Sequence, residues 1–177
     1  MCVSTNGLLL PYTASAGAPT LYIVGSGTCS TIRCGVNNTA SGYCSAALSG
    51  QCNSASGYYL SVIAGGVCNI ECGLAAKNFI GGGEKNIATN SAVHGVLGGG
   101  LCNRIEGFYS ALVGGICNIS CNCGSFVGAG RANTASAFYS TIVGGKANTA
   151  SQCASFVGGG CCNTASGCCG TVSGGYK

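Results

Sequence analysis

NTASAFYSTIVGGKA (residues 133–147) runs directly into NTASQCASFVGGGCC (148–162) and then into NTASGCCGTVSGGYK (163–177). These stretches are three successive copies of one 15-residue unit. Such a unit is too short for a helical hairpin, and its Gly, Ser, Thr and Val residues are poor helix formers. The repeat therefore predicts a β-solenoid in which each copy forms one coil.

The repeat extends back to residue 23 with steps of 15 to 17 residues. The coils start at Ile23, Asn38, Asn53, Asn69, Asn86, Asn103, Asn118, Asn133, Asn148 and Asn163. We thus expect an all-β solenoid of about ten coils over residues 23–177, preceded by an arm or cap over residues 1–22. The two longest coils, 69–85 and 86–102, have extra residues near Ala75, Ala76, Ser91 and Ala92, which we interpret as bulges in one loop.

A glycine is the third-last residue of every coil. Glycine at a fixed position indicates a turn with positive φ or a close backbone approach to the next coil. The structural turn glycines are Gly35, Gly50, Gly66, Gly83, Gly100, Gly115, Gly130, Gly145, Gly160 and Gly175.

An aliphatic residue three positions before that glycine forms the expected core column. Its members are Ile32, Ala47, Ile63, Ile80, Leu97, Leu112, Val127, Ile142, Val157 and Val172. Two residues earlier stands a column that is mostly serine, so serine and aliphatic residue share one strand face. We expect the buried hydroxyls to bond to backbone or to each other. The asparagines that start the coils are interpreted as structural, because Asn tolerates left-handed turns and its amide can hydrogen-bond between coils.

Composition excludes several functional classes. The chain has 33 Gly, no Trp and 6% charged residues, which is typical of neither an ordinary globular enzyme nor a charged disordered tail. Its seven basic residues are spread along the coils, so we expect no nucleic-acid binding. The longest apolar run near the start, residues 8–10, predicts neither a secretory signal nor a membrane span.

Sixteen cysteines give the composition of a disulfide scaffold. Stacked coils bring thiols of neighbouring coils about 4.8 Å apart, which allows bridges between coils or subunits but leaves the pairing open. Buried free thiols and a metal site are the alternatives, although no CxxC spacing occurs. The main disulfide candidates are Cys2, Cys52, Cys68, Cys102, Cys117, Cys162, Cys168 and Cys169.

Adjacent apolar residues predict association with other copies. In Leu112-Val113 and Ile142-Val143 one residue faces the core and the other must face outward. The aromatic pairs Tyr58-Tyr59, Phe108-Tyr109 and Phe138-Tyr139 suggest a second apolar strip, on the other strand. A homotrimer would cover both, with isolated exposed apolar residues as the alternative.

TASG at the start of a coil and YSTIVGG near its end resemble the head repeats of trimeric autotransporter adhesins, the YadA-like left-handed parallel β-roll. The resemblance covers residues 23–177 and implies a left-handed homotrimeric roll packed around a three-fold axis. Those heads usually repeat nearer 14 residues, are poor in cysteine, and accompany a secretion signal and a membrane anchor. The cysteine-bearing form of this repeat also resembles repeat proteins of large DNA viruses and the β-rolls of phage fibres.

The last coil, 163–177, has the sequence of an interior repeat. We therefore expect it to receive the N-terminal arm or first coil of another subunit, which gives a head-to-tail filament that disulfides, including one at Cys2, lock.

Catalysis, cofactors and metal ions find no support in the sequence. His94 is the only histidine, Asp is absent, and Glu71, Glu84 and Glu106 are far apart in the sequence. Cys102 is the nearest thiol in sequence after His94, but no nucleophile motif surrounds it, and His94 is expected in a solvated loop. The Gly-Gly-Gly runs 98–100 and 158–160 lack the Lys-Ser/Thr of a phosphate loop.

Two non-enzymatic functions remain. One is a self-assembling fibre subunit on a virion or cell surface, and the other is an adhesive fibre head that binds a surface receptor or glycan. A binding site is expected where the coils are irregular, over residues 69–102. Ice binding is a minor alternative, because ordered Thr-x-Thr rows are missing.

Overall fold

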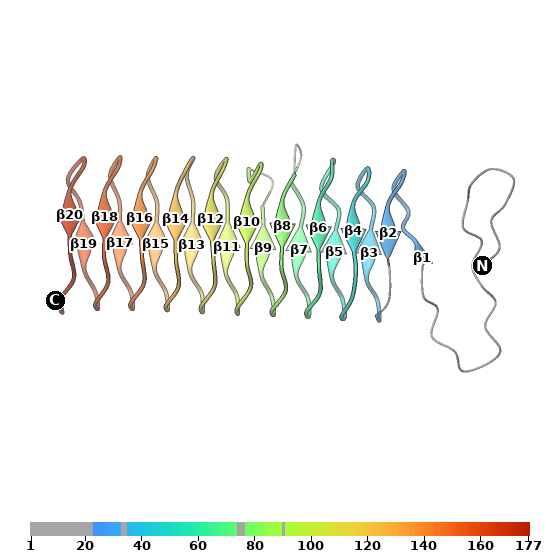
Figure 1. Ribbon diagram of the computed structural model, residues 1–177, viewed down its shortest axis with the longest axis horizontal. Coiled ribbons are helices and arrows are strands. Elements are labelled where there is room, and N and C mark those ends of the chain that lie inside the picture. Colours follow the sequence, from blue (N-terminus) through green and yellow to red (C-terminus); the bar gives the residue numbers. More distant parts are fainter. Residues whose placement is uncertain (1–22, 33–34, 74–76, 90) are drawn as a thin grey trace, which may run out of the picture.

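The computed structural model describes residues 23–32, 35–73, 77–89 and 91–177. The expected arm over residues 1–22 lies outside these residues, as do Cys2, Ala75 and Ala76. The described part is a parallel β-solenoid of about nine turns, in which coils stack along one long axis (Figure 1). The prediction of an all-β solenoid is confirmed.

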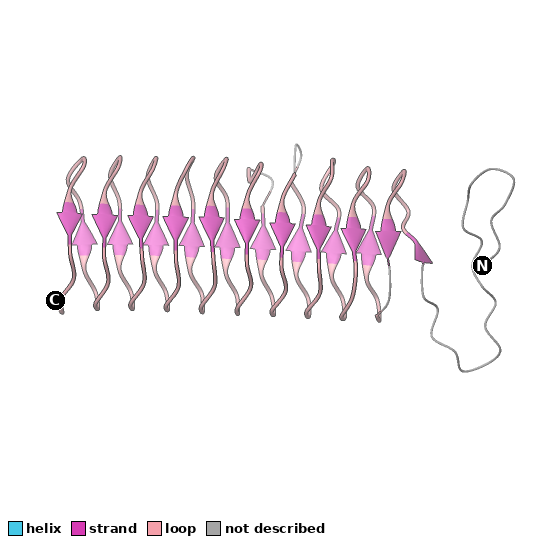
Figure 2. Ribbon diagram, viewed as in Figure 1, coloured by secondary structure: helices cyan, strands magenta, loops and turns pink. Residues whose placement is uncertain are grey.

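Two sheets form the two walls of the stack, and every strand in the described residues is two residues long (Figure 2). The larger sheet has eleven described strands: β1 (Ile23–Val24), β2 (Thr31–Ile32), β4 (Ala46–Ala47), β6 (Val62–Ile63), β8 (Phe79–Ile80), β10 (Val96–Leu97), β12 (Ala111–Leu112), β14 (Phe126–Val127), β16 (Thr141–Ile142), β18 (Phe156–Val157) and β20 (Thr171–Val172). The smaller sheet has nine: β3 (Thr39–Ala40), β5 (Ser54–Ala55), β7 (Ile70–Glu71), β9 (Ile87–Ala88), β11 (Arg104–Ile105), β13 (Ile119–Ser120), β15 (Thr134–Ala135), β17 (Thr149–Ala150) and β19 (Thr164–Ala165).

The core is a narrow layer between the two walls. From β2 to β20 the second residue of each strand points inward, and the larger sheet contributes Ile, Leu or Val from β6 to β18. Opposite them the smaller sheet contributes mostly alanine, so large side chains meet small ones across the coil. Ile32 and Val172, at the two ends of the core column, are only partly buried. This complementarity fixes the distance between the walls.

The serine column lies beside this core and is satisfied locally. The hydroxyls of Ser45 and Ser110 donate to the carbonyls of Gly42 and Gly107 at 2.9 and 2.8 Å. Each bond closes a short turn three residues long. Among the described residues no buried side-chain nitrogen or oxygen lacks a hydrogen-bond partner, as expected for polar groups in a closed interior.

Two kinds of turn connect the walls and line opposite edges of the stack (Figure 1). The turn that precedes each starting asparagine is called the coil-end turn, and the other is called the distal turn. Of the predicted extra residues, Ser91 and Ala92 lie in the distal turn, between β9, which ends at Ala88, and β10, which starts at Val96. The strands on both sides keep their pairing, Ile63 to Ile80 to Leu97.

The first predicted coil is not a parallel coil. Ile23 and Val24 pair antiparallel with Ile32 and Thr31, whereas all other strand pairs in the described part are parallel. The chain reverses at 25–30, where the amide of Ser30 donates to the carbonyl of Gly27 at 3.1 Å. The strand β1 therefore lies at one end of the larger sheet in a direction that no other strand of that sheet shares.

Candidate functional site

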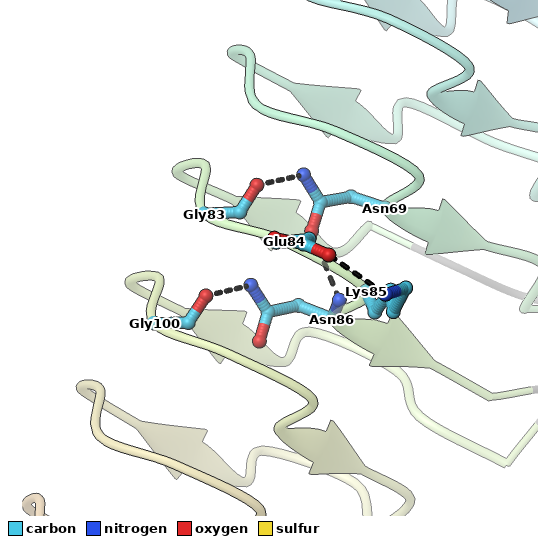
Figure 3. Close-up of polar contacts among 6 residues, drawn as sticks. All are labelled: Asn69, Gly83, Glu84, Lys85, Asn86 and Gly100. Carbon is cyan, nitrogen blue, oxygen red and sulfur yellow. Dashed lines mark hydrogen bonds and ion pairs between the residues drawn. The ribbon is translucent and has the colours of Figure 1, made fainter.

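The coil-end turns are joined to one another by an asparagine ladder. The side-chain amide nitrogen of Asn86 donates to Gly82 O in its own turn and to Gly100 O in the next turn, both at 2.9 Å. Its oxygen accepts the backbone amide of Asn103 at 2.9 Å. Figure 3 shows the same arrangement at Asn69 and Asn86. Most hydrogen bonds of the asparagine side chains are to backbone groups rather than to each other. Because every coil has these backbone groups, each turn can bond to the next one in the same way.

The turn glycines are required by both conformation and space. All ten have positive φ, from +82° at Gly83 to +136° at Gly175. A Cβ atom built on Gly115 would lie 2.2 Å from the carbonyl oxygen of Gly130. Only glycine allows successive turns to approach this closely.

The residue directly before each starting asparagine adopts the left-handed conformation, and it is often cysteine. Cys52, Cys68, Cys102, Cys117 and Cys162 have φ between +54° and +61°. At other coils the position holds Asn37, Lys85, Ala132 or Ala147 with similar φ. This column is solvent-facing, so its thiols form an accessible strip along one edge of the stack.

Cysteines also gather in the distal turns. Cys29, Cys44 and Cys169 have φ between +51° and +56° there. The backbone amides of Cys44 and Cys169 donate to the preceding turn, to Thr28 O and Cys153 O, both at 2.8 Å. The two edges of the solenoid therefore each carry a column in which thiols of neighbouring coils stack.

None of the fourteen cysteines in the described residues is in a disulfide. The Sγ atoms of Cys161 and Cys162 lie 3.2 Å apart and those of Cys168 and Cys169 lie 3.9 Å apart. No group of three metal-ligating side chains surrounds a common point within the described part of the chain. The disulfide hypothesis therefore stays a prediction. The described cysteines are free thiols, which an oxidant could convert to disulfides.

The environment raises the pKa of several thiols. Burial, followed by the neighbouring Cys29, raises the pKa of Cys44. Hydrogen bonding to Cys168 raises the pKa of Cys169, and burial and then Glu106 raise that of Cys121. A raised pKa keeps these groups as thiols at neutral pH, which slows their reaction because the thiolate is the nucleophile.

The outer face of the larger sheet is uncharged from β4 to β20. Its outward positions are the first residue of each strand and the residue after the strand, and the eighteen side chains or glycines there include no Asp, Glu, Lys or Arg. Val113, for instance, is 59% exposed while Leu112 beside it is buried. The predicted outward apolar residues are therefore part of one continuous surface, which we call the uncharged face.

At most strands of the uncharged face, a large side chain at one outward position is matched by a small residue at the other. Phe79, Phe126 and Phe156 are each followed two residues later by a glycine, and a Cβ built there would lie 3.4 to 3.6 Å from the ring. Where the first residue is small, as in Ala111 and Thr141, the later one is valine. Large rings thus lie over glycines, and the face is more level than its composition indicates.

The aromatic pairs lie in distal turns, and the expectation that they form a strip on the other strand is wrong. Tyr58, Tyr59, Phe108, Tyr109, Phe138 and Tyr139 fall outside all strands and are exposed. Tyr58 and Tyr59 meet edge to face, with ring centroids 4.5 Å apart. The ring of His94 stacks on that of Tyr109 at 5.1 Å. Turn conformation overrides the alternation expected of a strand, because positive φ at Tyr109 and Tyr139 redirects their side chains.

Sequence reasoning missed a buried carboxylate. Glu71 takes the inward position of β7, where the neighbouring coils have Ala55 and Ala88, and it is fully buried. Its oxygens accept from the amides of Gly57 at 2.8 Å and Gly73 at 3.0 Å, and from the side chain of Asn78 at 3.1 Å. The signals in the sequence were Glu71 itself, at a coil position that is alanine in both neighbouring coils, and the replacement of serine by Asn78 in the adjacent column.

The structure does not bring the remaining candidate catalytic side chains, those of Glu84, Glu106, His94 and Cys102, together at one site. Glu84 pairs with Lys85 at 2.7 Å in a coil-end turn, as Figure 3 shows, and Glu106 pairs with Arg104 at 2.7 Å on the smaller sheet. His94 lies in a distal turn, whereas Cys102 lies in a coil-end turn on the opposite edge. In the described residues no helix has the length and apolar character to cross a membrane.

No protein-family model matches the chain, and no curated protein is significantly similar to it in sequence.

Proposed function

We propose that this protein is a structural subunit of a fibre or filament, with its solenoids associated side by side as a homotrimer and stacked head to tail. We place the fibre on a virion or cell surface, in keeping with the resemblance to YadA-like heads and viral fibres. The observation that carries the proposal is the uncharged face, because a largely apolar surface without charges, continuous from β4 to β20, fits other copies of itself.

The uncharged face alone is small for a stable contact. At roughly 4.8 Å per coil, nine coils span about 43 Å. With a width of about 10 Å, the face buries on the order of 400 Å² per chain, about half of a standard interface. A stable assembly therefore needs further contacts, and head-to-tail stacking adds them because it lengthens the face.

Head-to-tail stacking is supported by the asparagine ladder. Each coil offers the next one the same set of donors and acceptors, as the bonds from Asn69 to Asn86 and from Asn86 to Asn103 show. A coil of a second molecule that stacks on this set would find the contacts that any interior coil finds. Repeated contacts of this kind are heterologous and give open assemblies.

The test is the mass of the assembly in solution together with negative-stain images. We expect a trimer mass or a multiple of it, and rods that lengthen with concentration. The variant Val113→Glu places a charge on the uncharged face at an exposed position, so the fold is retained but the trimer dissociates. Thr149→Glu places the same charge on the smaller sheet and leaves the mass unchanged. A monomer at every concentration, or equal dissociation in both variants, would overturn the proposal.

A second candidate is an adhesive fibre head that binds a surface receptor or glycan. The exposed aromatic side chains of the distal turns, from Tyr43 to Tyr139, favour it because aromatic rings with a polar edge are common in recognition surfaces. A glycan array probed with the wild-type chain and with Tyr109→Ser tests it. Binding that depends on Tyr109 would support this function, and the absence of binding in both would remove it.

A further inference from the structure

Three pairs of cysteines occupy the same left-handed turn position on neighbouring coils. Cys29 and Cys44 stack in the distal turns, and Cys52 with Cys68 and Cys102 with Cys117 stack in the coil-end turns. Each pair is separated by 15 or 16 residues in sequence. The sequence showed which cysteines recur, but only the strand register shows which of them are neighbours.

The backbone holds each pair at bridging distance. All six residues have φ between +51° and +56°. The amides of Cys44, Cys68 and Cys117 donate to the preceding turn, to the carbonyls of Thr28, Gln51 and Leu101 at 2.8 to 2.9 Å. Coils stacked in this way place equivalent Cα atoms about 4.8 Å apart, within the range of about 4.4 to 6.8 Å found in disulfides.

The thiols are accessible, and at one pair they interact. Cys29, Cys102 and Cys117 are exposed, and Cys44, Cys52 and Cys68 are partly exposed. The neighbouring Cys29 contributes, after burial, to the raised pKa of Cys44. A dissolved oxidant can therefore reach these pairs without opening the coil.

We propose that Cys29–Cys44, Cys52–Cys68 and Cys102–Cys117 are sites of disulfide formation between successive coils of one molecule. With a small-molecule disulfide such as oxidised glutathione, one thiolate attacks the oxidant and releases a reduced glutathione. The second thiolate then attacks the mixed disulfide and releases another, so two thiols lose two protons and two electrons. Each bridge fastens one coil to the next, and in a solenoid such neighbouring contacts determine stability.

Among the described residues, the other cysteines lack such a partner or have a competing one. Cys72 stacks between Ser56 and Thr89, and Cys121 between Glu106 and Ser136. Cys161 and Cys162 are adjacent in sequence, so a bridge between them would strain the planar trans peptide. The Sγ atoms of Cys168 and Cys169 lie 3.9 Å apart, and Cys168 also stacks on Cys153 of the preceding coil. The strand register therefore does not show which of the two would be the partner of Cys168.

Peptide mapping of the full chain tests the proposal. The folded protein is incubated with oxidised glutathione, alkylated, unfolded and digested with chymotrypsin without reduction. Aromatic residues lie between the members of every pair, at Tyr43, at Tyr58 and Tyr59, and at Phe108 and Tyr109, so cleavage leaves each bridge joining two peptides. We expect the three pairs as linked peptides and a higher unfolding temperature after oxidation.

Two variants separate these bridges from general oxidation. Cys102→Ser should leave Cys117 alkylated and the other two bridges intact, whereas Cys121→Ser should leave all three bridges in place. The map is read on the monomer band of a non-reducing gel, so its outcome does not depend on filament formation. Linked peptides from different columns, bridges found only between molecules, or full alkylation of the six thiols after oxidation would overturn the assignment.

Discussion

The side-chain oxygen of Asn103 accepts the backbone amide of Asn118 at 2.9 Å, one coil further along the stack. Asn118 repeats the bond toward Asn133 at 2.9 Å, and its side-chain nitrogen donates to Gly114 and Gly130 at 3.0 and 2.9 Å. The buried side chain of Asn118 therefore joins two successive turns, and the backbone amide of the same residue adds a bond to the preceding asparagine. Because the same bonds recur from coil to coil, the ladder sets both the rise and the alignment of the solenoid.

Asn118→Ala should destabilise the protein strongly. The change leaves the amide of Asn133 and the carbonyl of Gly114 without the asparagine side chain as partner, whereas the carbonyl of Gly130 keeps the amide of Ile116. We expect a loss of about 2 to 4 kcal/mol in the free energy of unfolding, since each unsatisfied buried group costs about 1 to 3 kcal/mol. Chemical denaturation followed by circular dichroism measures it. Asn122→Ala, which removes two bonds of 3.1 and 3.3 Å at a half-exposed residue, is the control and should cost less because water can replace them. Equal losses would contradict the ladder's role.

Gly115→Ala should destabilise, whereas Gly159→Ala should not. The first residue has φ of +95° and would place its Cβ 2.2 Å from Gly130 O, while nothing lies within 4 Å of a Cβ at Gly159. The strained conformation alone costs on the order of 1 to 3 kcal/mol. Thermal unfolding of the two variants gives the comparison. A similar melting temperature for both would show that the turns adjust more easily than the geometry indicates.

Glu71→Ala should destabilise although alanine is the residue that both neighbouring coils have at this position. The amides of Gly57 and Gly73 and the side chain of Asn78 would lose their acceptor, at a cost of about 2 to 4 kcal/mol. Denaturation of this variant and of Glu84→Ala, an exposed acid, checks it. If Asn78→Ser, made together with Glu71→Ala, brings the stability back, the loss belongs to the polar cluster. A Glu71→Ala protein as stable as the wild type would show that the cluster contributes nothing.

Alkylation of Cys121 should shift to higher pH in the folded protein. Burial and then Glu106 raise its pKa, so the thiolate population grows only above the pH at which an ordinary cysteine ionises. The rate of modification by iodoacetamide, followed by mass spectrometry against pH, gives the midpoint. Glu106→Gln should move that midpoint back downward in part. The unfolded chain is the reference, and a folded midpoint at or below the unfolded one would contradict the expected shift.

Periodicity was enough to predict the coil, the inward aliphatic column from Ile63 to Val157, and the turn glycines as a class. These features repeat in every coil, so each depends on local conformation and on a neighbour of the same kind. The reversal at Ile23 and Val24 could not be predicted in this way, because the spacing of residues does not give strand direction. The burial of Glu71 was not predicted, because its partners Gly57 and Asn78 come from different positions of different coils.

The amino-acid sequence by itself determined the solenoid, since a short repeat of small and β-branched residues can bury its apolar column only by stacking on its own copies. Only the tertiary structure decided which thiols are neighbours, how phenylalanine and glycine level the uncharged face, and where the aromatic side chains point. Those features depend on the register between coils and on the φ of single turn residues, which the spacing of the repeat leaves open.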